Sequence, residues 1–288
     1  MAKKLASRGY SVRSWANIMM VMPAFLLLLI LYVYPILQIG WISFTDPHPG
    51  THNYQEILTS LTHGKIFYQT FYMSFLVTLI CLVLGYLIAY TADHVENRRT
   101  IVLMLFFVLV PFWTSILIRA YSWIVILRQD GIINHFLMSL GLLNSPAVLV
   151  RNRFGVIVGM VHVMLPFMTL PLFSVMKGID KQLIQAARSL GAGPFTAFWK
   201  IYLPLSMPGV YAGVILVFIL SLGFYITPAL LGGGKFVMLA EYIALQIQLV
   251  LKWGMGSALA ILLLVMVLGL LFVFGRFIDI RKLMSGYR

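Results

Sequence analysis

Gly232-Gly233-Gly234-Lys235 is the stretch of this sequence whose residue types most suggest phosphate chemistry. A nucleotide-binding phosphate loop needs the spacing Gly-x4-Gly-Lys-Ser/Thr, because its backbone N–H groups and lysine surround the phosphates while the hydroxyl binds Mg²⁺. Here Ala229 stands where the first glycine is required, and Phe236 stands where the hydroxyl is required. We therefore expect no ATP site on this chain, so any ATP and Mg²⁺ that drive its work must bind to a partner.

A second set of residues with possible chemistry lies in one loop and consists of Asp46, His48, His52 and His63. Their spacing matches no strong metal-binding pattern, and the prolines and glycine among them indicate a turn. A hydrolase would need a nucleophile beside a base, but His162, Ser74 and Ser115 fall on three different apolar segments. The sequence therefore predicts no catalytic residue, no metal site and no cofactor bound by this chain, which is not expected to be an enzyme.

The composition indicates what surrounds these residues. Of the 288 residues, 61% are hydrophobic and 10% are charged, whereas a soluble domain has about 45–50% apolar and about 25% charged residues. That excess of apolar side chains does not fit inside one core of this size, so lipid must be the solvent. The formal net charge of +13 is spread between apolar runs, which favours anionic lipid headgroups rather than nucleic acid as its partner. The single Cys81 excludes an intrachain disulfide bond.

Charge-free stretches predict an all-α membrane protein with six transmembrane helices in a single domain, residues 1–288. Each stretch is long enough to cross about 30 Å of hydrocarbon at about 1.5 Å per residue. The first follows a basic segment and is too long for a cleavable signal, so we expect an uncleaved first helix. The predicted spans lie near 20–42, 70–92, 101–119, 154–176, 209–231 and 255–276.

A seventh charge-free stretch, 131–150, contains polar residues and an Asn144-Ser145-Pro146 break, so it predicts a short interfacial helix. The distribution of basic residues supports this choice. With six spans and both termini cytoplasmic, 14 of the 21 Lys and Arg residues lie inside, but a seventh span leaves only 10 inside. The positive-inside rule therefore favours six spans with both termini cytoplasmic.

The longest predicted cytoplasmic loop, 177–208, has the pattern of an ordered helical hairpin. Asp180 is a suitable N-cap, and Leu183, Ala187 and Leu190 share one helical face. Gly191 would end this helix and Pro194 would begin a second one, before Pro204 and Pro208 break the chain again. These features alone are equally consistent with a pair of helices that only rests on the membrane surface.

The same loop resembles the EAA loop of ABC-importer permeases, the membrane subunits of binding-protein-dependent uptake systems. That family has Glu-Ala-Ala, three residues, Gly, nine residues and Ile-x-Leu-Pro, and every spacing is met. The resemblance implies a type I ABC-importer permease fold in the bacterial cytoplasmic (inner) membrane. It also implies a coupling helix that docks on a separate ATP-hydrolysing subunit. Gln185 replaces the family glutamate, so a charge-assisted contact there becomes a neutral one. The implied ATPase-coupling residues are Gln185, Ala186, Ala187, Gly191, Ile201, Leu203 and Pro204.

Other segments resemble the spermidine/putrescine permease subfamily, which implies a polyamine as cargo. The segments are Val110–Ser115, Arg119–Trp123, Leu165–Met168, Leu203–Gly209 and Phe224–Gly233. Members of this subfamily also carry other solutes. An opine-like or organic-anion cargo therefore stays open, and Arg119 and Arg128 near the outer face would suit it.

Polar and kinked positions in the spans predict the solute pathway and its gate. Pro228 should bend span five near Phe224, and Gly232-Gly233-Gly234 after it would form a deformable hinge. Aromatic rings can guide a cation by cation–π contacts, although kinks and aromatic belts also occur for packing alone. The residues assigned to the pathway and gate are Trp113, Tyr121, Trp123, Phe224, Tyr225, Thr227 and Pro228.

The acids Asp46, Glu56, Asp130 and Glu241 lie outside the predicted spans. We therefore expect solute selectivity to reside mainly in a separate periplasmic binding protein, received by the outer loops 43–69, 119–153 and 232–255. The other expected partners are a pair of ATP-binding subunits, a second permease subunit as a heterodimer partner, and membrane lipid. An ion-gradient-driven secondary transporter is the alternative from another class, but it would need a midplane ionisable residue or inverted repeats. If the chain were a structural or receptor membrane protein, the pattern of loop 177–208 would have no explanation.

Overall fold

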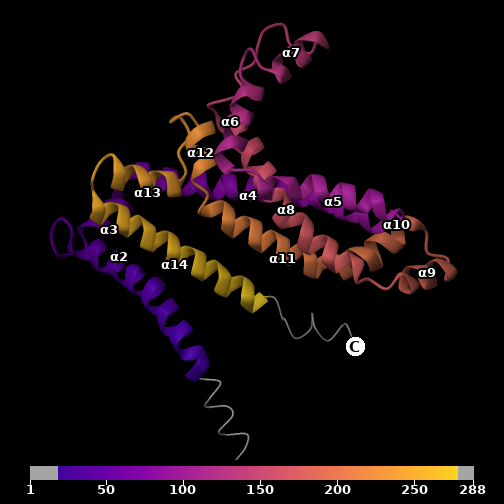
Figure 1. Cartoon of the computed structure of the whole chain (residues 1–288), viewed down its shortest axis with the longest axis horizontal. Helices are drawn as coiled ribbons and strands as arrows, with labels where there is room; N and C mark the ends of the chain where they lie inside the picture. The colour runs from indigo at the N-terminus through magenta and orange to yellow at the C-terminus, as the bar shows by residue number, and fades with distance from the viewer. Residues whose placement is uncertain (1–18, 278–288) are drawn as a thin grey trace, which may run out of the picture.

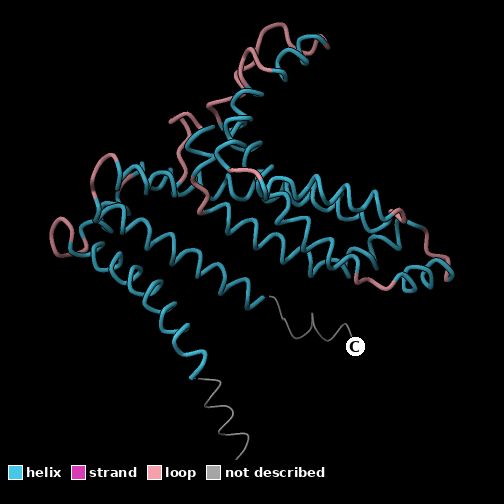
Figure 2. Tube along the Cα trace, in the orientation of Figure 1, coloured by secondary structure: helices cyan, strands magenta, loops and turns pink. Residues whose placement is uncertain are grey.

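The computed structural model describes residues 19–277, and within that range the secondary structure is entirely helical (Figures 1 and 2). The predicted cytoplasmic placement of the two termini concerns segments outside the described residues. The helical elements are η1 (Leu29–Val33), α2 (Tyr34–Thr45), α3 (His52–Thr59), α4 (Leu61–His94), α5 (Arg98–Trp113), α6 (Ile116–Leu127), α7 (Ile132–Ser139), α8 (Arg153–Lys177), α9 (Lys181–Ser189), α10 (Pro194–Ala197), η2 (Phe198–Tyr202), α11 (Leu203–Leu222), α12 (Ile226–Leu231), α13 (Leu239–Gln248) and α14 (Trp253–Phe277).

Three long helices, α4, α8 and α11, form the centre of the molecule, with α8 packed against both others. One face of α8 is buried along its length. The residues of that face recur at every fourth position and are Met160, Met164, Met168, Leu172 and Met176. Gly85 of α4 and Gly213 of α11 face this stripe. A Cβ atom at Gly213 would lie 2.6 Å from the Met168 Sδ. Small residues therefore let the helices approach closely, which is how helices associate in lipid.

Five helical segments in the described residues are long and apolar enough to cross a membrane, and a sixth results if α5 and its continuation count as one bent span. The five are Met19–Thr45, Leu61–His94, Arg153–Lys177, Pro194–Leu222 and Trp253–Arg276. The Met19–Thr45 segment lies away from the three-helix centre, and its α2 part packs against α14 (Figure 1). Most of its surface is therefore left for lipid or another chain.

The predicted continuous span 101–119 is wrong in one respect, because the helix breaks at Thr114 and Ser115. The helical axis before the break and the one after it differ by 106°. Pro111 lacks an N–H and so weakens the last turn of α5. The Thr114 hydroxyl donates to the Pro111 carbonyl at 3.2 Å, and the Thr114 backbone is extended before α6 begins at Ile116.

The stretch 131–150 contains a short helix, α7, as the sequence predicted. Its anchor is the fully buried Asn134, whose amide nitrogen donates to the Arg128 and Ala147 carbonyls at 2.9 and 3.0 Å. The Asn134 carbonyl oxygen accepts from the Ala147 N–H at 2.9 Å. One side chain thus closes the loop on both sides of α7, which projects from the bundle beyond α6 (Figure 1).

A second, smaller core lies where α3, α13, α14 and the first turns of α4 meet. Ile57, Ile66, Leu239 and Leu259 are buried there. The Leu239 N–H donates to the hydroxyl of the buried Thr70 at 2.8 Å, which fixes the start of α13 on α4. We call this the α3 end of the bundle and the opposite one, where α4 finishes beside α9, the α9 end (Figure 1).

Candidate functional site

The first arm of the helical hairpin at the α9 end, α9 itself, begins and ends as its sequence predicted. Asp180 caps α9, since its carboxylate accepts from the Gln182 N–H at 2.9 Å. After Ser189, Gly191 adopts φ +85°, a left-handed conformation that glycine reaches without steric cost. The Gly191 N–H donates to the Arg188 carbonyl and the Ala192 N–H to the Ala187 carbonyl, both at 3.0 Å. This is a Schellman ending, which turns the chain sharply toward α10.

The second arm of the hairpin is the start of a membrane-spanning helix and is not a separate element. The predicted break at Pro204 and Pro208 is wrong, because α10, η2 and α11 form one helical run, Pro194–Leu222. Pro208 lies inside this run, and so does Pro204, whose missing N–H removes one regular i→i−4 bond without ending the helix. The π-helical turn η2 precedes Pro204, and the Leu203 N–H donates to Phe198, five residues earlier. The second arm of the hairpin is therefore continuous with α11.

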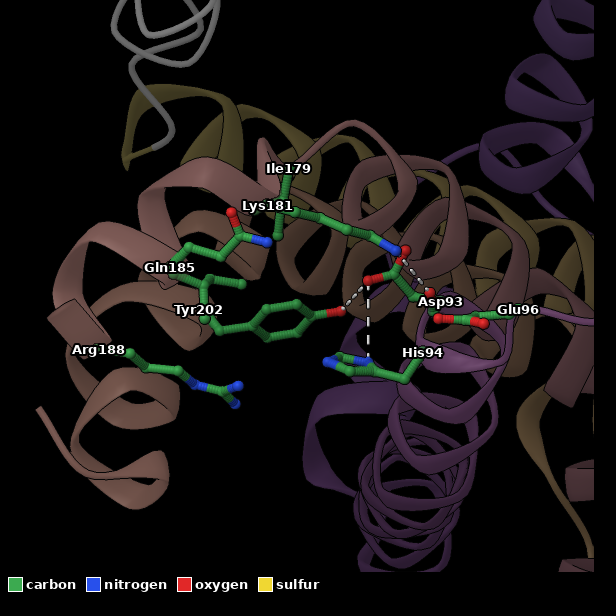
Figure 3. Close-up of a pocket in the computed structure, with 9 residues that line it drawn as sticks. Asp93, His94, Glu96, Ile179, Lys181, Gln185, Arg188 and Tyr202 are labelled. Carbon is green, nitrogen blue, oxygen red and sulfur yellow. Dashed lines mark hydrogen bonds and ion pairs between the residues drawn. The ribbon is translucent and has the colours of Figure 1, made fainter.

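A cavity of about 180 Å³ lies between the hairpin and the last turn of α4 (Figure 3). Asp93, at the end of α4, has 4% of its surface exposed and accepts from the Tyr202 hydroxyl at 3.0 Å. Lys181 Nζ lies 3.5 Å from the Asp93 main-chain oxygen. The walls of the cavity are Asp93, His94, Glu96, Ile179, Lys181, Ile184, Gln185, Arg188 and Tyr202.

Of the residues assigned to coupling, Gln185 lines this cavity, and Ala186 beside it is exposed on α9. Ala187 is half-buried and Gly191 is exposed at the hairpin turn. The other three belong to the second arm and do not line the cavity. They are Ile201 in η2 and the α11 residues Leu203 and Pro204. Gln185, Ala186 and Gly191 are therefore exposed on the hairpin and available for contact with another subunit.

Sequence reasoning did not assign a functional role to Asp93 or Tyr202, although the position of each in the sequence is distinctive. Asp93 is the acid that ends the charge-free stretch containing span two, and Tyr202 lies inside the resembling loop. Their contact joins residues 109 positions apart, so no local pattern reveals it. The one sequence feature that could have drawn attention to Asp93 is its position as an acid at the end of an otherwise charge-free stretch.

Apart from Trp113, which ends α5, the residues assigned to the pathway and gate lie on α6, on α12 or just before α12, and α12 packs against α6 and α8. Thr227 and Pro228 are buried in these contacts. Trp123 of α6 donates its indole N–H to His162 Nδ1 of α8 at 3.0 Å, and Phe224 packs against the same buried cluster. These four residues are buried or half-buried, whereas the three others are exposed, namely Trp113, Tyr121 and Tyr225.

The break in span five lies at Gly223–Tyr225, between α11 and α12, and the glycines after α12 form a tight turn. Gly233 and Gly234 have φ values of +60° and +73°. A Cβ atom at Gly233 would lie 2.6 Å from the Arg151 Cβ, so alanine there would strain the turn itself. Gly223 has φ −92° and open space around its Cβ position. Gly223 is thus the position at which hinge freedom can be reduced without a clash.

Glu241, in the first turn of α13, has 5% of its surface exposed, and its Oε2 has no hydrogen-bond partner among the described residues. Burial raises the pKa of this carboxyl to about 7, while a hydrogen bond from the Met238 backbone acts in the opposite direction. The position of Glu241 three residues after the N-cap Met238 is that of a capping-box acid. The loop acid Asp46 has a similar structural role, since it accepts from the Gly254 N–H at 2.6 Å. Residues 19–277 contain no cluster of three metal-ligating side chains.

Comparison with known proteins places this arrangement in a family. Residues 70–280 match the family described as "Binding-protein-dependent transport system inner membrane component". The chain is 37% identical over 224 residues to the spermidine/putrescine transport system permease protein PotB of Haemophilus influenzae, covering 78% of each chain. PotB of Escherichia coli is 36% identical over 224 residues, covering 78% of this chain and 81% of that protein.

The fold also matches a solved structure. A chain of a bacterial alginate ABC transporter, crystallised in complex with an alginate pentasaccharide-bound periplasmic protein, superposes with a TM-score of 0.77 at 18% identity. The match covers 94% of this chain and 96% of that one. The fold is thus that of an ABC transporter membrane chain. The protein therefore belongs to the family of binding-protein-dependent transport system inner membrane components, and it is a non-catalytic, multi-pass permease subunit of the inner membrane.

Proposed function

We propose that this chain is one permease subunit of an ABC importer that takes up a polyamine such as spermidine or putrescine. The observation that carries the proposal is the 36–37% identity to two spermidine/putrescine permeases over 78% of the chain. Family membership also sets aside an ion-gradient-driven secondary transporter, because the family works with a binding protein.

In this proposal the hairpin of loop 177–208 docks on an ATPase subunit, which binds the ATP and Mg²⁺. Its rigid ends support that role, since Asp180 and Gly191 fix the two ends of α9 and the second arm continues into α11. Each permease chain presents one such hairpin, so a second permease subunit would engage the other member of an ATPase pair.

The outer loops 43–69 and 232–255 contain α3 and α13, at the opposite end of the bundle from α9 (Figure 1). This separation supports a binding protein at the α3 end and an ATPase at the α9 end. The third outer loop, 119–153, contains α7. Its side chains Ile132 and Phe136 are exposed and give a docking edge for the binding protein.

An organic-anion cargo is the second candidate, and one observation favours it. Arg119 lines a cavity of about 120 Å³ together with Pro111, Phe112 and Pro166, and the Arg119 Nε is buried without a partner in the described structure. Arg128 is less available, because its Nε lies 2.9 Å from a carboxylate oxygen of Asp130. A free guanidinium beside the pathway would attract a carboxylate and repel a polyamine.

Cargo is tested by reconstituting the chain with its second permease, ATPase and binding protein in proteoliposomes. We expect spermidine or putrescine to accumulate and to stimulate ATP hydrolysis, with no response to an opine or a dicarboxylate. Stimulation by the anions alone would replace the polyamine proposal with the anion one.

The docking end is tested by cysteine cross-linking, which is straightforward because the native Cys81 is fully buried. Leu190, at the hairpin turn, is 89% exposed, and Leu61, at the start of α4, is 92% exposed. We expect L190C to cross-link to the ATPase and the matched control L61C to remain unlinked to it. Cross-linking from L61C alone would reverse the assigned ends.

A further inference from the structure

The contact between α4 and the hairpin is made by groups that are costly to bury. Asp93 ends α4 almost fully buried, and its Oδ2 accepts the Tyr202 hydroxyl at 3.0 Å (Figure 3). Its Oδ1 is buried without a hydrogen-bond partner within the described residues. A buried carboxylate that lacks a partner on one oxygen destabilises the fold compared with an apolar side chain. Packing alone therefore does not account for an acid at this position.

The contact is directional because aromatic rings hold Tyr202 in place. Its ring lies 5.2 Å from that of Tyr90 at an edge-to-face angle, and 6.0 Å from that of Phe198 in a stacked arrangement. Tyr90 and Phe198 also meet edge to face at 5.6 Å. Such aromatic pairs contribute about 0.5–1.5 kcal/mol each beyond area burial. The Tyr202 hydroxyl is thus fixed on Asp93.

Asp93 also meets the first arm of the hairpin. Lys181, the first residue of α9, directs its ammonium group along the cavity toward Asp93, with Nζ 3.5 Å from the main-chain oxygen (Figure 3). One residue of α4 therefore contacts both arms, through Lys181 of α9 and Tyr202 of η2. Both arms would have to move with the end of α4 as long as these contacts persist.

We propose that Asp93 is a positioning residue for energy coupling, which clamps the hairpin to α4 so that a movement imposed on α9 is transmitted to α4 as well as to α11. The inference rests on the proposed docking of loop 177–208 on an ATPase. Without the clamp, α9 could be displaced while α4 stayed in place, and ATP hydrolysis would be less tightly linked to solute movement.

The test compares hydroxyls that join the same two helices at two depths. Tyr202→Phe removes the bond to Asp93. The matched control is Tyr86→Phe, since the Tyr86 hydroxyl lies 3.0 Å from Ser206 Oγ and joins α4 to α11 deeper in the bundle. The readout is the number of spermidine molecules imported per ATP hydrolysed by assembled complexes in proteoliposomes. A purely structural defect lowers the yield of complex and leaves this ratio unchanged.

We expect Tyr202→Phe to lower the transport-to-hydrolysis ratio about two- to tenfold, the range that one buried hydrogen bond supplies, and Tyr86→Phe to keep the wild-type ratio. Asp93→Ala should match Tyr202→Phe, the double variant should be no worse than either, and Asp93→Asn should restore part of the ratio through its amide oxygen. Equal ratios for Tyr202→Phe and Tyr86→Phe would overturn the proposal.

The outcome of Gly191→Val separates this inference from the proposed docking. If that variant leaves coupling intact, the assigned role of the hairpin fails. If it uncouples the complex while Tyr202→Phe does not, the hairpin docks on the ATPase and only the role of Asp93 fails.

Discussion

The sharpest prediction concerns the turn of the coupling hairpin at Gly191. Its φ of +85° lies in the left-handed region, and no atom lies within 4 Å of the position that a Cβ would take. A side chain there meets no neighbour, so a substitution acts on the backbone alone. The left-handed conformation costs an L-residue about 1–2 kcal/mol, and a β-branched residue suffers most. Gly191→Val should therefore reduce the population of the observed turn about 5- to 30-fold.

A distorted turn would break the hydrogen bonds from Gly191 to Arg188 and from Ala192 to Ala187, which align α9 with the second arm. We expect Gly191→Val to insert and assemble normally while losing the stimulation of ATP hydrolysis by the loaded binding protein. The assay is ATP hydrolysis in proteoliposomes with and without that protein, normalised to assembled complex. Retained stimulation would show that the geometry of the turn is irrelevant to coupling.

Two further variants control this experiment. Gly191→Asn should keep most of the coupling, because asparagine tolerates the left-handed region. Gly193→Ala lies two residues away and also meets open space, but its φ of −65° suits any L-residue. It should behave as wild type. Loss of coupling in Gly193→Ala equal to that in Gly191→Val would refute the argument from backbone conformation.

Three other predictions follow from the same structure. Gly223→Ala reduces backbone freedom at the break in span five, so the variant should assemble normally yet transport more slowly at saturating ATP and loaded binding protein. Transport at the wild-type rate would show that the break is only the end of a helix and does not act as a hinge. The raised pKa of Glu241 means that its contribution to stability is full below pH 4.5 and is lost as pH rises through about 7. At about 1.4 kcal/mol per pKa unit, thermal unfolding in detergent should show about 3 kcal/mol less stability at pH 8 than at pH 4.5 from this group, a dependence that Glu241→Gln removes. Asn134→Ala leaves the Ala147 N–H and two carbonyls without their partner and should expose loop 128–147 to proteolysis, with the helical content by circular dichroism unchanged.

The sequence alone predicted the features that depend on local chemistry. Charged residues bound most of the apolar helices, and Asp180 and Gly191 bound α9, because capping and left-handed turns are decided by a few neighbouring residues. The short helix α7 was also predictable, since its polar residues make it too short to span a membrane.

Features that depend on distant contacts were predicted wrongly or missed. Pro204 and Pro208 were read as breaks, but both lie inside the helical run Pro194–Leu222, which continues because α11 packs against α4 and α8. The bend after Trp113 was missed because Pro111 alone does not determine where a weakened helix turns. The pairing of Asp93 with Tyr202 arises only when α4 and η2 pack together, so it has no signature in either segment.

The methionine stripe on α8 has a consequence for observing the transporter at work. Met160, Met164, Met168 and Met176 have almost no exposed surface, so dissolved oxidants do not reach their sulfur atoms while α4 and α11 stay closed on α8. Unbranched thioether side chains adjust to a sliding neighbour with little loss of contact. If α4 and α11 part from α8 during turnover, each opening admits oxidant and leaves a sulfoxide that mass spectrometry can count. The extent of sulfoxide formation at these methionines during turnover would therefore measure how often α4 and α11 separate from α8.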